Sequence, residues 1–548
     1  MERSWLGQYP AGVPADIDLA GYDSVADFLT RTSATYPRRT AVVCGDIELD
    51  YMTLDALSEA FAAYLQMIER LPSGARVALM MPNVVQYSIA LFGVLRAGMV
   101  VVNLNPQYTE REVAFHLGDS GASLLVAWEG ATAVARAAAE SAGCRLILAS
   151  SGEMAALPRL LRDGARGGSG DVEEANRRAV PGFLQAVETG SLPERPRTPL
   201  SPDAIAFLQY TGGTTGLPKG AILTHRNIIA NVLQLSTWLR GTLRGPEVCV
   251  VTVLPMYHIM ALTGNCLLSA AGGWKNVLIP NPRDLSSLVD QWRRHRFSFF
   301  VGVNTLFNAL LDFESFHDLD FGGLAYTCGA GAAVQATVAA RWQELTGCAL
   351  SGGYGLTEAS PTVCMTPPAT TARTQTVGVP VSSTELRLLD DDGRDVTPGT
   401  PGEIVVRGPQ VMRGYWNRPE ETQASFTADG FLRTGDIAVM DPQGYVSIVD
   451  RKKDVVLVSG FNVYPNEIEQ VVASHPNVAE CACIGVQDAK TGEALRVFVV
   501  ARQPAPTAEM LQAWCRERLT GYKVPRQFEF REALPKSAVG KILRRAMR

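Results

Sequence analysis

The feature that most constrains the fold is a strand–helix–strand unit near the start of the chain. Residues 76–81 (RVALMM) form a short apolar run typical of a buried strand. Residues 83–98 (NVVQYSIALFGVLRAG) have the apolar spacing of a helix and end in glycine, and residues 99–106 (MVVVNLNP) are again apolar. Because parallel strands need such a crossover, this unit predicts a mostly parallel sheet with right-handed connections.

The same pattern recurs through the first 400 residues, with apolar runs at 122–130, 248–255, 274–280 and 297–304. We therefore predict an α/β architecture with more than one sheet. Residues 151–203 are rich in Gly, Pro and Ser and are expected to form a surface loop. A β-rich subdomain is expected over residues 378–450, where short alternating strands are separated by turns, and a compact α+β piece follows from residue 451.

Composition narrows the class of protein. A chain of 548 residues suggests two to four domains, and its net charge of −5 gives no overall basic field for nucleic acid. The start of the sequence lacks the basic head and apolar core of a secretory signal. Ten cysteines are too few for a disulfide scaffold, and Cys481 and Cys483 are expected to be buried free thiols on one face of a strand. These features favour a cytoplasmic protein.

Two uncharged runs are long enough to span a bilayer, Val77 to Leu95 and Val248 to Trp274. Each is interrupted about a third of the way along, the first by Pro82 and the second by Pro255. We expect each run to form a buried strand, a turn and a buried helix rather than a membrane span.

A Gly/Thr-rich loop, TGGTTGLPKG (residues 211–220), follows the expected strand at 204–210. Its glycines allow positive φ angles and close backbone approach, its threonines supply donors, and its lysine supplies a mobile charge. Such a loop can surround the oxygens of a triphosphate, although a merely flexible turn is the alternative. It does not fit a P-loop, in which Gly-Lys-Ser/Thr opens a helix. The phosphate-binding residues expected here are Thr211, Gly212, Gly213, Thr214, Thr215, Gly216 and Lys219.

This loop resembles the phosphate loop of the adenylate-forming superfamily, which includes acyl- and aryl-CoA synthetases, peptide-synthetase adenylation domains and firefly luciferase. Within it, the chain resembles bacterial long-chain fatty-acid–CoA ligases from end to end. The resemblance rests on collinear stretches: WLGQYPAGVPADI, NPQYTERE, PMYHIMALT, VGVNTLFNALL, GYGLTE, LRTGDIAVMD, VDRKKDVVLVSGFNVYPNEIE, LTGYKVPR and LPKSAVGKILRR. It implies a large domain over 1–450 and a small mobile domain over 451–548, with a hinge near 450–453.

The resemblance also implies residue roles. Glu358 of GYGLTE is expected to bind Mg²⁺ together with Thr211, and one carboxylate plus ATP oxygens suits this ion. Asp436 and Arg451 are the expected ribose contacts, although TGD alone is also an ordinary turn. Further residues expected to bind ATP or coenzyme A are Gly329, Ala330, Gly331, Gly353, Tyr354, Gly355, Thr357, Lys453 and Gly460. The expected acid pocket contains Tyr257, His258, Gly302, Val303 and Gly352.

Lys541, near the end of the sequence, matches the catalytic lysine of adenylation, and a compact charge on a long tether suits that role. Seen alone, the surrounding basic residues would be interpreted as a nonspecific tail. His258 is not required as a base, because an acid substrate arrives ionised, and an ordinary buried histidine is the alternative. The domain rotation about Lys453 would first close the site over ATP and acid, and would then bring another face to coenzyme A.

The expected reaction joins a fatty acid to coenzyme A through an acyl-adenylate, with ATP and Mg²⁺. Three alternatives are an acyl-carrier-protein acceptor, a phosphoryl-transfer enzyme that forms ADP, and a non-catalytic acyl-binding protein. The chain departs from its relatives at Ala330, Ala332, Ala333 and Gly352, which leaves medium-chain or unusual acids open. We hypothesise that Gly352 tunes acid or nucleotide binding. Peripheral membrane contact would suit a fatty-acid enzyme, and a homodimer is the family-level expectation.

Overall fold

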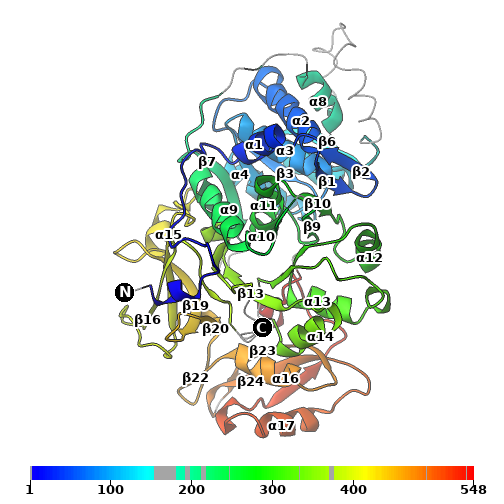
Figure 1. Cartoon of the computed structure of the whole chain (residues 1–548). Helices are drawn as coiled ribbons and strands as arrows, with labels where there is room; N and C mark the ends of the chain where they lie inside the picture. Colours follow the sequence, from blue (N-terminus) through cyan, green and yellow to red (C-terminus); the bar gives the residue numbers. More distant parts are fainter. Residues whose placement is uncertain are drawn as a thin grey trace.

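The computed structural model describes residues 3–153, 180–191, 195, 198–211, 218–245, 247–331, 334–368, 376–488, 490–537 and 540–548. The fold is mixed α/β, with a large N-terminal domain and a smaller C-terminal domain, as expected from the sequence (Figure 1). The C-terminal domain lies below helices α13 and α14 of the large domain in this view, and the four-stranded sheet lies to one side.

The first sheet contains the strand–helix–strand unit that the sequence predicts. Seven described strands form it in the order β18 (Gly414–Tyr415), β8 (Lys219–Thr224), β7 (Ile205–Thr211), β4 (Val100–Asn103), β3 (Arg76–Met80), β5 (Ala122–Trp128) and β6 (Arg145–Ala149). Strands β4, β3, β5 and β6 pair in parallel, as β7 does with β4. Helix α3 (Val85–Arg96) connects β3 to β4 and is buried on every side, which explains why apolar residues surround it.

The second sheet is also mostly parallel. Its nine described strands run in the order β15 (Val379–Pro380), β14 (Thr362–Met365), β13 (Leu350–Gly355), β12 (Tyr326–Gly329), β11 (Phe299–Gly302), β9 (Cys249–Thr252), β10 (Lys275–Leu278), β1 (Thr40–Cys44) and β2 (Ile47–Asp50). The five central pairings are parallel, and the edges are antiparallel. The strands expected at 248–255, 274–280 and 297–304 are therefore confirmed.

Helices cover the seven-stranded and nine-stranded sheets of the large domain (Figure 1). The described helices are α1 (Asp27–Thr35), α2 (Tyr51–Ala63), α4 (Glu110–Ser120), α5 (Thr132–Ala142), α8 (Phe183–Gly190), α9 (His225–Leu239), α10 (Ile259–Ala261), α11 (Leu268–Gly272), α12 (Leu285–Arg294), α13 (Asn304–Leu311), α14 (Ala336–Thr346) and α15 (Pro419–Ala424). Helix α8 corrects one prediction, because it lies inside the segment 151–203 that the sequence assigns to a surface loop. It buries Phe183 and Val187 against the main core, and these apolar positions outweigh the Gly and Pro around them.

A third, antiparallel sheet corresponds to the β-rich region predicted after residue 378. It consists of β16 (Glu385–Leu389), β17 (Gly402–Arg407), β19 (Leu432–Met440) and β20 (Val446–Arg451). The region is not self-contained, because β15 joins the nine-stranded sheet and β18 joins the seven-stranded one. These two short strands fix the small sheet beside the larger ones.

The C-terminal domain has its own core. Its sheet contains β22 (Phe461–Val463), β21 (Val456–Val458), β24 (Gly492–Ala501), β23 (Val478–Asp488) and β25 (Gln527–Phe530), and helices α16 (Pro465–Ala473) and α17 (Ala508–Arg516) complete the domain. Cys481 and Cys483 lie buried in this core as free thiols, as predicted.

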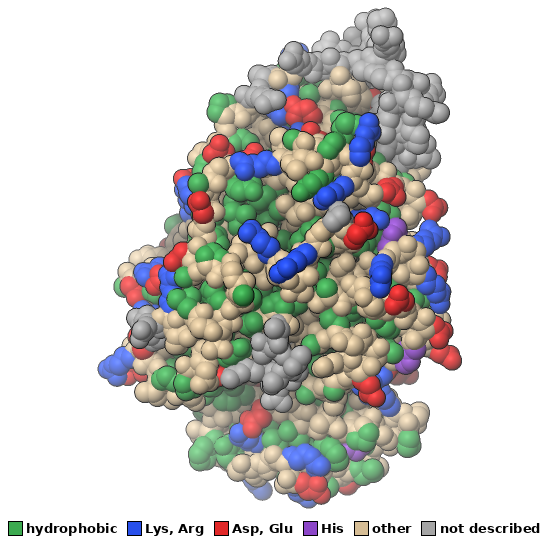
Figure 2. Space-filling view, in the orientation of Figure 1, with side chains coloured by type: hydrophobic (Ala, Val, Ile, Leu, Met, Phe, Trp, Pro, Cys, Tyr) green, Lys and Arg blue, Asp and Glu red, His purple; other side chains and the backbone are tan. Residues whose placement is uncertain are grey.

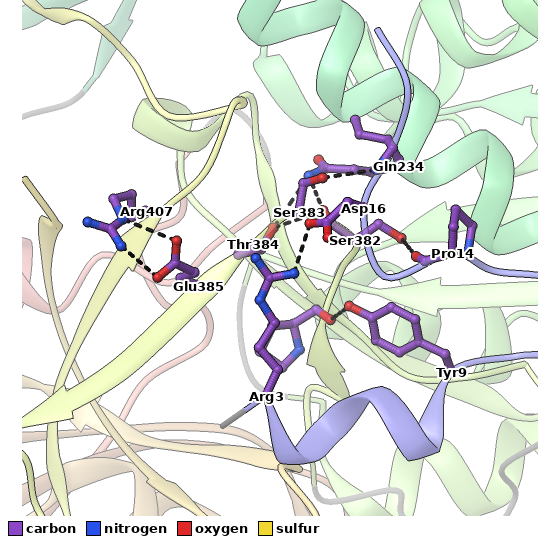
Figure 3. A network of polar contacts seen from close by, with 12 residues as sticks. Arg3, Tyr9, Pro14, Asp16, Gln234, Ser382, Ser383, Thr384, Glu385 and Arg407 are labelled. Atoms are coloured by element: carbon purple, nitrogen blue, oxygen red, sulfur yellow. Dashed lines mark hydrogen bonds and ion pairs between the residues drawn. The ribbon is translucent and has the colours of Figure 1, made fainter. Parts of the chain in front are cut away.

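The N-terminal segment lies against the end of β15 and the residues that follow it (Figure 3). The Tyr9 hydroxyl donates to the carbonyl of Pro380 at 2.8 Å, and the Ser382 hydroxyl donates to the carbonyl of Pro14 at 2.7 Å. The Gln234 amide of α9 donates to the Ser382 carbonyl at 2.6 Å. Residues separated by more than 300 positions are thereby held together at one edge of the sheet.

Both uncharged runs form a strand followed by helices, as predicted: β3 and α3 occupy the first, and β9, α10 and α11 the second. Across the ranges described above, no helix is long and apolar enough to cross a membrane. Lys and Arg side chains are interspersed with Asp and Glu on the face that Figure 2 shows, in keeping with a small net charge.

Candidate active site

Asp436 is a buried carboxylate held between two side chains from different elements. It lies on β19 directly opposite Arg451 on β20, and the guanidinium Nε lies 3.3 Å from Asp436 Oδ1. The Tyr354 hydroxyl, at the end of β13, donates to Asp436 Oδ2 at 2.7 Å. Burial and the charge of Asp436 raise the pKa of Tyr354 well above its usual value, so Tyr354 remains a neutral donor. The sequence analysis expected Asp436 and Arg451 to contact the ribose and placed Tyr354 in a separate nucleotide motif, and the structure brings the three side chains together.

A second carboxylate, Glu358, lies in the short turn Thr357–Ala359 that follows β13. The Tyr415 hydroxyl on β18 donates to Glu358 Oε1 at 2.7 Å. Burial raises the pKa of Glu358, and this is partly opposed by the Tyr415 hydrogen bond and by the charge of Arg451. A buried carboxylate of this kind gains free energy when a cation approaches it.

Tyr415 also contacts the phosphate-loop lysine. Lys219 Nζ lies 5.3 Å from the centre of the Tyr415 ring, within the range of a cation–π interaction. Tyr415 therefore lies between two predicted site residues, and the sequence analysis missed it. No local pattern could have identified it, because β18 is only two residues long and Glu358 lies 57 positions away.

The predicted phosphate loop joins two antiparallel strands. Thr211 on β7 and Lys219 on β8 are register partners, so the loop is the tip of a hairpin rather than the start of a helix. Residues Gly212, Gly213, Thr214, Thr215 and Gly216 lie outside the described residues. The hairpin is anchored by Asp119 of α4, whose carboxylate accepts from the Tyr210 hydroxyl at 2.6 Å and from Arg418 at 2.7 Å.

Lys541 projects from a tight turn of the C-terminal domain. The Ser537 N–H donates to the Lys541 carbonyl at 2.7 Å, and the Gly540 N–H donates to the Ser537 carbonyl at 2.9 Å. Burial and the positive charge of Arg451 lower the pKa of Lys541 to about 8, while Asp436 acts in the opposite direction. Lys541 therefore lies near the Asp436–Arg451 pair although it comes from the far end of the sequence.

His258 lies close to Lys541 at the start of α10. Its Nδ1 accepts from the Met260 N–H at 3.4 Å. Burial, assisted by the positive charge of Lys541, lowers the pKa of His258 to about 4, so the ring is neutral at physiological pH. Its neighbour Tyr257 is fixed through its carbonyl, which accepts from the Gln209 amide at 2.7 Å. These contacts fit a wall of the site, and none of them requires a catalytic base.

Several glycines of the predicted site lie where another segment of the main chain approaches so closely that a side chain would not fit. A Cβ added at Gly355 would lie 2.1 Å from the Pro361 carbonyl oxygen, and one at Gly352 would lie 2.4 Å from that of Thr376. A larger residue at either position would displace main chain. The missing side chain at Gly352 is thus accounted for by packing, and its effect on acid or nucleotide binding stays a prediction.

The remaining predicted residues lie in several parts of the structure. At Gly331, whose φ is +78°, a Cβ would lie 3.8 Å from Val303 and 3.7 Å from Met260, which places these residues together beside β11 and β12. Cβ atoms at Gly302, Gly329 and Gly353 would meet Phe307, Val334 and Cys328, and the Ala330 N–H donates to the Gly302 carbonyl at 3.1 Å.

Lys453 lies near Arg451, and burial lowers its pKa. Gly460 occupies an open turn between β21 and β22, with nothing within 4 Å of the position of a Cβ. Ala332 and Ala333 lie outside the described residues.

The family follows from a comparison with family models. Residues 29–416 match the model described as AMP-binding enzyme, and residues 467–541 match the one described as AMP-binding enzyme C-terminal domain. The chain belongs to the AMP-binding enzyme family. It is 48% identical to the long-chain-fatty-acid–CoA ligase of Escherichia coli O157:H7 and 44% identical to that of Haemophilus influenzae, in each case over 100% of this chain and 98% of the relative.

Solved structures support the same fold. The chain resembles the crystal structure of ATP-bound MatB from Rhodopseudomonas palustris with a TM-score of 0.82 and 26% identity, covering 95% of this chain and 98% of that one. The resemblance extends over both domains of this AMP-binding enzyme.

The donor set of this AMP-binding enzyme fits Mg²⁺ bound mainly by nucleotide oxygens. Within the described ranges, no three His, Cys, Asp or Glu side chains gather in a way that could hold a metal ion alone. Glu358 supplies one carboxylate whose Oε1 is already fixed by Tyr415. Mg²⁺ keeps several waters and is commonly bound by one or two carboxylates plus phosphates, so Glu358 would hold it. Thr211, the second expected ligand, is the last residue of β7 and borders the phosphate loop.

Proposed function

We propose that the chain is an ATP-dependent, AMP-forming long-chain fatty acid–CoA ligase. In the first step a fatty carboxylate oxygen attacks the α-phosphorus of ATP, and the bond to the bridging oxygen breaks to release pyrophosphate. In the second step the coenzyme A thiolate attacks the acyl carbon of the acyl-adenylate, and AMP leaves. No protein nucleophile is required, so the protein supplies position and charge.

The observation that carries this proposal is the convergence of Lys541 on the Asp436–Arg451 pair. Carboxylate attack on a triphosphate builds negative charge. Lys541 is a buried cation, and no carboxylate of the described residues lies within 4.0 Å of its ammonium group. Asp436 can accept from both ribose hydroxyls, and Lys219 would hold the β- and γ-phosphates that leave as pyrophosphate. Bound at Glu358, Mg²⁺ would neutralise charge on the departing pyrophosphate.

The proposal that the acid is a long-chain fatty acid rests on the similarity of the chain to its relatives. Relatives named long-chain-fatty-acid–CoA ligase match over the whole chain at 44–48% identity. The alternative is the same adenylation with a medium-chain or unusual acid, or with an acyl-carrier-protein acceptor. The departures at Ala330 and Gly352 keep that alternative open.

A panel of acids of different chain length tests the proposal. The purified protein is incubated with ATP, Mg²⁺, coenzyme A and each acid, and AMP, pyrophosphate and acyl-CoA are measured together. We expect equal amounts of all three products, with the highest kcat/KM for long chains. Formation of ADP, or a maximum for short or aromatic acids, would contradict the reaction or the acid class respectively.

Lys541→Ala tests the site within the same assay. Removing the ammonium should suppress adenylate formation by about a hundredfold or more, because it removes charge stabilisation made only in the transition state. Thermal unfolding should be unchanged within a few degrees. A variant that still formed acyl-AMP at the wild-type rate would disprove the role of Lys541.

We extend the proposal to the organisation of the enzyme. The C-terminal domain would rotate about residues 450–453 between the two steps, and the protein would act as a homodimer in contact with the membrane surface, where fatty acids partition. Light scattering in solution and flotation with phospholipid vesicles test these two points. A monomer, or a protein that does not float with vesicles, would contradict the corresponding part.

A further inference from the structure

Helix α13 presents one polar face to the C-terminal domain. Thr305, Asn308 and Asp312 are spaced by three and four residues, which places them on one side of the helix. The Thr305 hydroxyl donates to the Gly540 carbonyl at 2.9 Å. Arg502, at the end of β24, donates to Asn308 Oδ1 at 3.1 Å and lies 3.3 Å from Asp312 Oδ2. We call these three residues the docking face.

Both sides of this contact are fixed within their own domains. Arg502 also donates to the carbonyl of Val478 at 2.7 Å, so its guanidinium is held by β23. On the other side, Arg341 of α14 donates to Asp312 Oδ1 at 2.8 Å. The two domains therefore meet through side chains whose orientation is already determined, and little ordering is needed when they dock.

The contact is sparse. A cavity of about 290 Å³ remains between the domains, lined on one side by residues of α13 and on the other by residues that include Glu480, Val500 and Lys536. Arg502 and Asp312 remain 33% and 44% exposed, so water screens their attraction and this pair holds the two domains together only weakly. Contacts of this kind hold an orientation without making it permanent.

The docking face acts directly on the turn that carries Lys541. Gly540 precedes Lys541 and has a φ of +80°, and a Cβ at Gly540 would lie 3.0 Å from Thr305 Oγ1 and 3.2 Å from Val303. The turn is thus seated on the first turn of α13, immediately after β11. Any shift of the domain across α13 moves the Lys541 ammonium relative to Asp436 and Arg451.

We propose that Thr305, Asn308 and Asp312, together with Arg502, are positioning residues that place Lys541 for the adenylation step. They touch neither substrate nor nucleotide, and they act through the orientation of the C-terminal domain. The inference rests on the proposed function, since it assigns the docking face to one of the two half-reactions. A displacement of about 1 Å at a reacting group can lower a rate by about a hundredfold, so weak contacts can have a large kinetic effect.

The test separates the two half-reactions. Fatty-acid-dependent exchange of labelled pyrophosphate into ATP reports adenylation, and acyl-CoA formation from supplied acyl-adenylate and coenzyme A reports the second step. Thr305→Val and Arg502→Gln remove the donors of the docking face, while Thr305→Ser and Arg502→Lys keep a hydroxyl or a charge. Arg526→Gln is the matched control, because Arg526 pairs with Asp488 inside the C-terminal domain at 3.4 Å.

We expect Thr305→Val and Arg502→Gln to lower the exchange kcat by about ten- to a hundredfold, with unchanged thermal unfolding and an unchanged second step. Thr305→Ser should restore most of the exchange rate, and Arg526→Gln should match wild type in both assays. Equal losses in both half-reactions, or no loss in either, would overturn the inference. A wild-type enzyme without any acid-dependent exchange would instead overturn the proposed function, and the inference with it.

Discussion

At the residue scale, Glu358 depends on a hydroxyl from another sheet. Tyr415 fixes Glu358 Oε1 while its ring lies below Lys219, so one side chain orients both the carboxylate proposed to bind Mg²⁺ and the lysine proposed to bind phosphate. Ligands of this kind are usually held by a further shell of hydrogen bonds, and losing such a partner commonly costs about ten- to a hundredfold in metal affinity or activity.

Tyr415→Phe isolates the hydroxyl, since it keeps the ring near Lys219. We expect the Mg²⁺ concentration for half-maximal adenylation to rise by about tenfold, because Glu358 loses its fixed orientation. Titration of Mg²⁺ in the pyrophosphate-exchange assay measures this. Tyr64→Phe is the matched control, because the Tyr64 hydroxyl donates to Glu69 at 2.7 Å away from the site. An unchanged Mg²⁺ dependence would show that Tyr415 does not orient the carboxylate.

The pKa of Lys541 predicts a pH dependence. The ammonium is charged below its pKa of about 8 and loses its proton as the pH rises through that value. We therefore expect kcat/KM for ATP in the exchange reaction to fall above about pH 8, because this parameter reports the free enzyme. Lys541→Arg should be slower at neutral pH but should lose this basic limb, since arginine stays protonated. A basic limb at the same pH in both proteins would assign it to another group.

Much of the residue-level site could be predicted because its motifs are short and continuous. Asp436, Arg451, Glu358 and Lys541 each lie in a recognisable stretch, and the structure brings these groups together. Tyr415 could not be found this way, since its role depends on the pairing of β18 with β8. The same reason applies to Gly352, whose meaning depends on a backbone segment that approaches it from further along the chain.

At the element scale, the hairpin formed by β7 and β8 explains why the phosphate loop differs from a P-loop. A P-loop directs its N–H groups at phosphate from the start of a helix, whereas this loop joins two antiparallel strands. The sequence predicted the strand before the loop but not the strand after it, because Lys219 was interpreted as part of the loop. Periodicity likewise missed α8, since eight residues between Gly- and Pro-rich segments give a weak helical signal.

Asp119 is the residue through which the hairpin is anchored, since it accepts from both Tyr210 and Arg418. Asp119→Asn keeps the shape but weakens both hydrogen bonds and leaves Arg418 without its carboxylate. We expect the free energy of unfolding to fall by about 1–3 kcal/mol and KM for ATP to rise more than KM for the acid. Urea denaturation and initial rates measure the two effects. Equal changes in both KM values would argue against a specific effect on the hairpin.

At the scale of the whole molecule, the two domains meet around a buried arginine at the predicted hinge. Arg544 of the C-terminal domain pairs with Glu469 of α16 at 2.7 Å and with Asp450, the penultimate residue of β20, at 2.9 Å. The Asp450 side chain is only 1% exposed. The Glu469 pair lies within the C-terminal domain, whereas the Asp450 pair links that domain to the strand that enters the hinge.

Asp450→Asn should loosen this link while Glu469 still holds Arg544 in place. Removing one partner of a buried pair is costly, so we expect local opening at residues 451–453. These are three consecutive basic residues, and tryptic cleavage there should become several-fold faster than in wild type. Thr434→Ser, which keeps the hydroxyl that donates to the Ile404 carbonyl, is the control and should be cut at the wild-type rate. Unchanged cleavage in Asp450→Asn would show that the pair does not restrain the hinge.

The alternation of strands and helices in the sequence predicted the α/β class, but it did not predict how the sheets and the two domains are placed relative to one another. Placement depends on contacts between distant segments, such as the docking of Gly540 on Thr305 across 235 positions. Such contacts leave no local period in the sequence, so they become visible only when the chain is folded.

The N-terminal segment that crosses to Pro380 also has a consequence during synthesis. Tyr9 leaves the ribosome long before the carbonyl it binds, which lies 371 positions later in the chain. At about 5–20 residues per second, roughly 20 to 75 seconds pass before that partner is made. During this interval the Tyr9 hydroxyl lacks its native partner, so we expect the N-terminal segment to stay open to chaperones until late in synthesis.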